Sequence, residues 1–111
     1  MGVQRDVLNP LITQRDKIVF HLKKEQRKKA IQELQELSKF IKTNLPEVKR
    51  IHDGLYGILI DLKTEADSII KNLTAREILC DAAQQKFDKE YKKAKSSVDE
   101  ISNEEKRGWG L

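Results

Sequence analysis

Residues 46–73 read PEVKRIHDGLYGILIDLKTEADSIIKNL, and the spacing of their apolar side chains indicates the fold class. These side chains recur at steps of three and four, at Val48, Ile51, Leu55, Ile58, Leu62, Ala66, Ile69 and Leu73. That period places them on one side of a helix and does not fit a strand, where side chains alternate between two faces. Because a single amphipathic helix in water needs other segments to cover its apolar stripe, the pattern predicts a helical bundle.

The segments on either side have helical patterns of their own. Residues 11–42 contain neither Gly nor Pro, and the apolar residues there and just beyond form two groups: Leu11, Ile12, Ile18, Val19 and Leu22, then Ala30, Ile31, Leu34, Leu37, Ile41 and Leu45. A third stripe follows at Cys80, Ala83, Phe87, Tyr91, Ala94, Val98 and Ile101. A chain of 111 residues with three such stripes predicts one all-α domain.

Local signals set the expected helix boundaries. Asn9 and Pro10 form a favourable helix start, whereas Pro46 interrupts a helix because it has no amide to donate. Thr74 and Glu77 have the spacing of a capping box. We therefore expect an elongated antiparallel three-helix bundle, running up-down-up, with helices at about 10–43, 46–72 and 75–102. Residues 1–9 are then an irregular lead-in, and residues 103–111 a flexible tail.

Two stretches leave the path of these helices open. The two apolar groups of the first helix are linked by steps of four, which rotate the stripe around the helix. That helix therefore either bends near residues 23–29 or has different partners at its two ends. Gly54 and Gly57 each cost about 1 kcal/mol in a helix relative to Ala. We nevertheless expect the second helix to continue through them.

The geometry of three unequal helices predicts a contact surface for a partner. Alignment of the first helix against the second leaves roughly the first fifteen residues of the chain with no helix to lie on, at 1.5 Å rise per residue. The expected partner-binding residues are on the apolar face of that segment: Leu8, Leu11, Ile12, Ile18, Val19 and Leu22. Our first hypothesis is a non-enzymatic interaction module, an adaptor or complex subunit, that binds a protein partner or a second copy of itself.

One strongly basic run predicts an alternative function. Residues 23–29 contain Lys23, Lys24, Arg27, Lys28 and Lys29 with one acidic residue, and they account for the whole formal net charge of +4. Such a run binds nucleic acid or an anionic membrane surface, and the apolar segment 18–22 before it is typical of helices that bind a membrane or calmodulin. The competing interpretation is a solvated helix face whose charge is offset by Asp61, Glu65 and Asp67 on the second helix.

The sequence predicts no catalytic site, metal site or cofactor. His21 and His52 are far apart, Cys80 is the one cysteine, and no set of Cys, His and carboxylate residues has a metal-binding spacing. His52, Asp53 and Tyr56 share adjacent helical turns but lack a nucleophile and an oxyanion donor. We expect no small-molecule substrate.

The same sequence indicates the compartment. No stretch approaches the roughly 20 consecutive apolar residues of a membrane-spanning helix, and the N-terminus lacks the apolar run of a secretory signal. A lone cysteine fits a reducing compartment. We expect an intracellular protein, cytoplasmic or nuclear. Two roles stay open for Trp109, an anchor for a partner pocket and a contact with the turn near Leu45.

Overall fold

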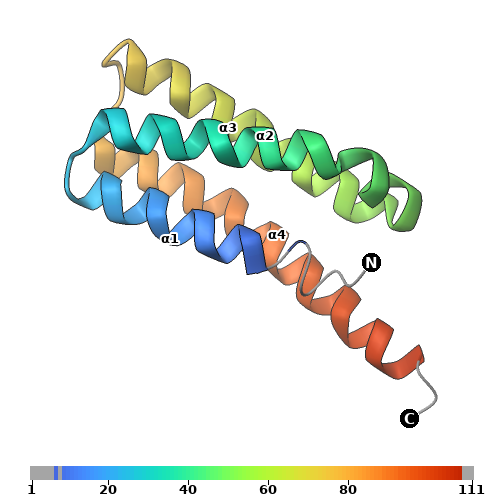
Figure 1. Ribbon diagram of the computed structural model, residues 1–111. Helices are drawn as coiled ribbons and strands as arrows, with labels where there is room; N and C mark the ends of the chain where they lie inside the picture. The colour runs from blue at the N-terminus through green and yellow to red at the C-terminus, as the bar shows by residue number, and fades with distance from the viewer. Residues whose placement is uncertain (1–6, 8, 109–111) are drawn as a thin grey trace.

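Over the residues that the structure describes, the chain forms a bundle of four antiparallel helices. The computed structural model describes residue 7 and residues 9–108, without the side chains of residue 51 and residues 102–108. The helices are α1 (Asn9–Lys23), α2 (Arg27–Ile51), α3 (Asp53–Thr74) and α4 (Cys80–Gly108). Each packs against the next, and α4 also packs against α1 (Figure 1). An elongated, all-α, antiparallel bundle is confirmed, with extents of 51 × 22 × 17 Å, but the expected number of helices was wrong.

The expected first helix is two helices, because the chain reverses direction at residues 24–26. At the end of α1 the amide of Gln26 donates to the carbonyl of His21 (2.9 Å), and the amide of Glu25 donates to that of Leu22 (3.1 Å). Glu25 has a φ of 56°. This is a Schellman motif, in which the left-handed position is usually glycine. Because Glu25 occupies it here, no glycine marks the turn, and only the rotation of the apolar stripe indicated a bend.

The expected break before Pro46 is also wrong, since Pro46 lies inside α2. Ile41 and Val48, on either side of it, are both buried in the core, so packing holds the helix together across the missing hydrogen bond. The chain instead reverses at His52, whose backbone is extended (φ −155°, ψ 104°). The Nδ1 atom of His52 accepts a hydrogen bond from the Leu55 amide (3.2 Å) and so caps the start of α3.

Two further boundary expectations also differ from the structure. Gly54 and Gly57 both lie in α3, but the expected helix at 46–72 is not continuous, because the chain reverses at His52 directly before Gly54. The capping box at Thr74 is wrong, since its hydroxyl donates back to the carbonyl of Ile70 (2.7 Å) and α4 begins only at Cys80. The loop between α3 and α4 starts with a second Schellman motif, in which Arg76 has a φ of 58°.

The end of the chain also differs from the expectation. Helix α4 continues to Gly108, so residues 103–108 are helical and not part of a tail. Residues 109–111, including Trp109, lie outside the described residues.

The predicted apolar stripes form the core. All members of the predicted α4 stripe are buried: Cys80, Ala83, Phe87, Tyr91, Ala94, Val98 and Ile101. In α3 the buried residues are Leu55, Leu59, Leu62, Ala66, Ile69 and Leu73, so Leu59 lies in the core where Ile58 was expected. Ile58 packs partly buried against the same cluster. The periodicity therefore identified the buried faces correctly even where the helix boundaries were wrong.

Candidate binding surface at one end of the bundle

The predicted partner surface lies inside the bundle. Four of its residues are at most 5% exposed: Leu11, Ile18, Val19 and Leu22. Ile12 is partly buried against the same core, and Leu8 lies outside the described residues. The expected overhang was wrong because α1 folds back beside α2 and α4, which cover its apolar face. The apolar face of α1 is therefore not left open for a partner by the geometry of the helices.

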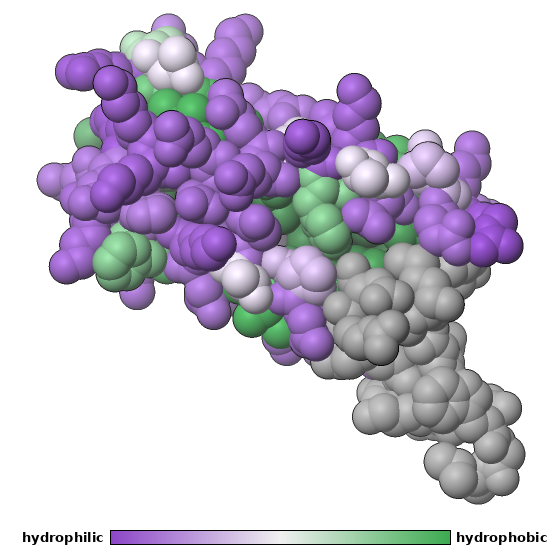
Figure 2. Space-filling view, viewed as in Figure 1, coloured by the Kyte–Doolittle hydropathy of each residue, from purple (hydrophilic) through white to green (hydrophobic). Residues whose placement is uncertain are grey.

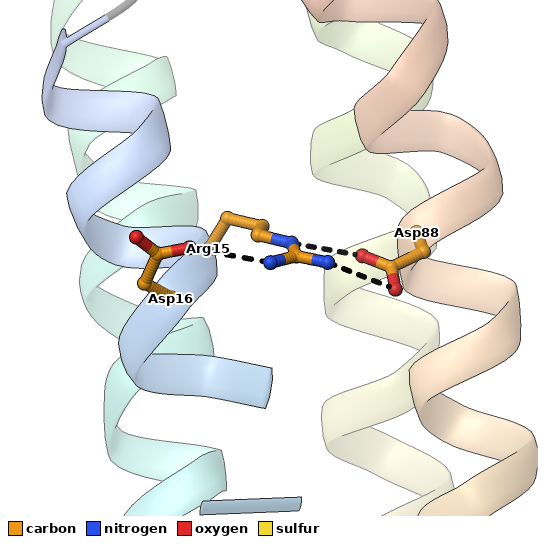
Figure 3. A network of polar contacts seen from close by, with 3 residues as sticks. All are labelled: Arg15, Asp16 and Asp88. Carbon is orange, nitrogen blue, oxygen red and sulfur yellow. Dashed lines mark hydrogen bonds and ion pairs between the residues drawn. The ribbon is translucent and has the colours of Figure 1, made fainter. Parts of the chain in front are cut away.

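A polar clamp holds α1 against α4 (Figure 3). Arg15 Nε donates to Asp88 Oδ1 (3.2 Å) and its Nη2 to Oδ2 (3.4 Å), while Nη1 donates to Asp16 (3.2 Å). The guanidinium also lies 5.7 Å from the centre of the Tyr91 ring. Burial disfavours its charge, but the hydrogen bonds to Asp88 and Asp16 outweigh that effect and raise the pKa of Arg15. This contact joins residues 73 positions apart, and the sequence did not indicate it.

The basic run forms one end of the bundle. The α1–α2 turn and the α3–α4 loop lie at the same end, on the left in Figure 1. They are in contact, because Arg27 Nη1 donates to the carbonyl of Ile78 (3.0 Å). Arg76 belongs to this loop and adds a further exposed cation. We call this end, residues 20–29 and 75–81, the basic tip.

The charge of the basic tip is not offset in the way that the sequence suggested. Ser38 Oγ donates to Asp67 (2.7 Å), and this register of α2 against α3 places Asp61, Glu65 and Asp67 beside the middle and far half of α2. Burial raises the pKa of Asp67, but hydrogen bonds from Lys63 and Ser38 outweigh it, so that this pKa is lowered. Asp67 is thus already bound to groups far from the basic run, and the expected offset of the run's charge by these three carboxylates was wrong.

The basic tip keeps an excess of positive charge. It contains six basic residues, Lys23, Lys24, Arg27, Lys28, Lys29 and Arg76, and three acidic ones, Glu25, Glu77 and Asp81. Its four lysines and Arg76 are exposed, and none of its charged residues takes part in an ion pair that the structure describes. Residues 25–29 and Arg76 line an open hollow, beside a second one bordered by Leu79, Cys80 and Asp81.

The basic tip also carries exposed hydrophobic side chains. Over the described part of the chain, the large hydrophobic residues that are exposed are Phe20 (55%) and Leu79 (73%), and both belong to it. The ammonium group of Lys24 lies 5.7 Å from the centre of the Phe20 ring. The face in Figure 2 is mostly hydrophilic at this end, with separate hydrophobic spots. Sequence reasoning missed Leu79 because it assigned residue 79 to a helix and not to a loop.

The other sequence candidates for chemistry have structural roles. His52 caps α3, and Cys80 is buried in the core. Among the side chains that the structure describes, those of residues 7, 9–50 and 52–101, no group of three or more His, Cys, Asp and Glu could hold a metal ion. None of the four helices has an apolar stretch long enough to span a lipid bilayer, as far as the structure describes them.

Comparison with known proteins adds no relative to this picture. No family model, curated protein or solved structure matches the chain. A fold class by itself does not identify a function, and the basic tip is the surface feature that points to one.

Proposed function

We propose that the protein is a non-enzymatic helical binding module that attaches to a polyanionic surface through the basic tip. The observation that supports this most is the position of the basic run on an exposed turn, with the excess of positive charge that surrounds it. Positive charge gathered at one end of an elongated molecule attracts phosphate-rich surfaces and orients the molecule toward them.

The position of the run matters as much as its charge. On a straight helix its side chains would point in several directions, and acidic neighbours on the adjacent helix would weaken their field. Here Lys23 ends α1, Lys24 lies in the turn, and Lys28 and Lys29 lie in the first turn of α2. All four are exposed at this end, where an anionic surface can reach them.

The alternative, a protein partner on the apolar face of α1, is less well supported. Leu11, Ile18 and Leu22 are almost inaccessible, so α1 would have to leave the bundle before they could bind anything. Departure of α1 would also break the contact between Arg15 and Asp88.

A charge-matched pair of variants tests the proposal. In the first variant, four lysines of the basic tip become Gln: Lys23, Lys24, Lys28 and Lys29. In the control, four exposed lysines elsewhere become Gln: Lys39, Lys42, Lys89 and Lys92. Each variant loses four positive charges from a formal net charge of +4, so both are neutral. Arg27 stays in both because it binds the Ile78 carbonyl.

Binding is measured against vesicles containing phosphatidylserine and against a short DNA duplex at several salt concentrations. Four phosphate contacts predict that DNA affinity falls by roughly a hundredfold between 50 and 200 mM salt, through counterion release. The tip variant should lose binding, whereas the control should keep most of it. Equal loss in the two variants, or binding that does not respond to salt, would refute the proposal.

A further inference from the structure

The exposed hydrophobic residues of the basic tip identify which anionic surface fits it. Phe20 lies in the last turn of α1, and Leu79 lies in the loop before α4. They come from different helical hairpins, and both lie at the same end of the bundle. Since other large hydrophobic side chains of the described residues are buried or partly buried, this pairing of exposed apolar groups with lysines sets the tip apart.

Each of the two hydrophobic residues adjoins the α1–α2 turn. The Phe20 ring lies beside the Lys24 ammonium, at 5.7 Å. Leu79 borders a hollow with Glu25 and Arg27, and the residue before it accepts the Arg27 hydrogen bond. Phe20 therefore adjoins a lysine, whereas Leu79 adjoins Arg27 together with Glu25 and Asp81, and both lie at the same end of the molecule.

The backbone of both loops is fixed by local hydrogen bonds. Glu25 and Arg76 each occupy the left-handed position of a Schellman motif, and the contact between Arg27 and Ile78 joins the two loops. A surface that is already ordered loses little conformational entropy when it binds. The basic tip can thus present Phe20 and Leu79 without a rearrangement.

We propose that the basic tip docks on a bilayer of anionic lipids, with Phe20 and Leu79 entering the boundary between headgroups and acyl chains. This inference rests on the proposed function and specifies that the polyanionic surface is a lipid membrane. Lysine and arginine side chains contact the anionic headgroups, while the two apolar side chains leave water for the interfacial layer. Glu25, Glu77 and Asp81 oppose the approach, but the tip keeps a net positive charge.

Nucleic acid fits these features less well. An exposed Phe20 ring can stack on a base of a single strand, but Leu79 is aliphatic and offers no stacking face. The phosphates of a duplex would contact the lysines and leave both hydrophobic side chains in water. An anionic membrane accommodates the lysines and both hydrophobic residues at once.

The test removes the two hydrophobic residues and keeps every charge. A Phe20→Ser, Leu79→Ser variant is compared with wild type and with a Gln35→Ser, Gln85→Ser control, whose two positions are also exposed. The probes are vesicles of phosphatidylcholine with phosphatidylserine, vesicles of phosphatidylcholine alone, a DNA duplex and a single-stranded oligonucleotide. The tip variant should bind phosphatidylserine vesicles roughly tenfold less tightly, because less apolar surface leaves water, and the control should bind like wild type.

A second variant reports insertion directly. Phe20→Trp in a Trp109→Phe background provides one fluorophore at the tip. Its emission should shift to the blue and be quenched by brominated lipids when phosphatidylserine vesicles are added, and duplex DNA should not produce the shift. An unchanged emission, or vesicle binding that does not respond to the serine substitutions, would overturn the insertion and leave the electrostatic role of the tip standing. Wild-type binding to nucleic acid without binding to vesicles would also overturn it, whereas binding to neither would refute the proposed function itself.

Discussion

Replacement of Glu25 or Arg76 by glycine should make the protein more stable. Both residues have left-handed backbones, with φ of 56° and 58°. That conformation costs an L-residue about 1–2 kcal/mol. Glycine adopts it freely but loses about 0.5–1 kcal/mol more backbone entropy on folding. The difference predicts a gain of about 0.5–1 kcal/mol in the free energy of unfolding at each site.

The sign of this effect distinguishes two architectures. If residues 10–43 formed one helix, Glu25 would lie in its interior, and glycine there would destabilise the protein by about 1 kcal/mol. In the four-helix bundle the same substitution relieves the backbone of a turn. An increase in stability therefore indicates the four-helix bundle, and a decrease indicates one continuous helix.

Thermal and urea denaturation, followed by circular dichroism, measure the effect. An unfolding entropy of about 2.1 cal/mol/K per residue converts the predicted gain into a rise in Tm of about 2–4 °C at each site. The control is Gln35→Gly on the exposed face of α2, which should lower Tm. Arg76→Gly also removes a cation from the basic tip, so it should weaken anion binding while it raises Tm. A lower Tm for Glu25→Gly would refute the turn.

Three further predictions follow from the core and the clamp. The double substitution Leu11→Asp, Ile18→Asp should abolish cooperative unfolding in a denaturant titration, because both positions are buried and each buried carboxylate costs several kcal/mol. A well-folded double variant would contradict the burial of these two residues. A double-mutant cycle with Arg15→Met and Asp88→Asn, measured by urea unfolding, should give a coupling free energy of about 1 kcal/mol. The two side chains are 31% and 18% exposed, so water screens the pair only in part. A coupling of zero would argue against the clamp. Burial raises the pKa of Tyr91 despite the opposing charge of Arg15, so the unfolded phenol ionises first and stability falls as pH rises beyond about 10. Tyr91→Phe should lose less stability than wild type over that range in pH-dependent melts, and equal losses would count against this effect.

The sequence was sufficient for the fold class and for the buried faces. Apolar side chains at steps of three and four give each helix one stripe, and that rule placed Phe87, Val98 and Ile69 in the core before any contact was known. Side-chain periodicity depends only on the local helix, so it survives errors in the boundaries.

The reversals of the chain were harder to predict, because tertiary packing and unusual residues determine them. Glu25 and Arg76 stand where glycine is expected, and Pro46 is tolerated inside a helix whose neighbouring turns are buried. The candidate site depended on those reversals. The reversal at His52 sets the register that places Ile78 and Leu79 beside the start of α2, and the turn at residues 24–26 makes that place an end of the bundle. The lysines were therefore predicted as a candidate surface, and their hydrophobic neighbour was not.

The distance between residues 13 and 39 tests most directly whether the chain turns and forms the basic tip. Thr13 and Lys39 are both exposed, on α1 and α2. Spin labels on cysteines at these positions, in a Cys80→Ala background, report that distance by pulsed electron paramagnetic resonance. The hairpin predicts a separation below about 20 Å, because the axes of packed helices lie about 8–10 Å apart. A separation near 39 Å, the value for about 1.5 Å rise per residue along one helix, would contradict the turn and with it the basic tip.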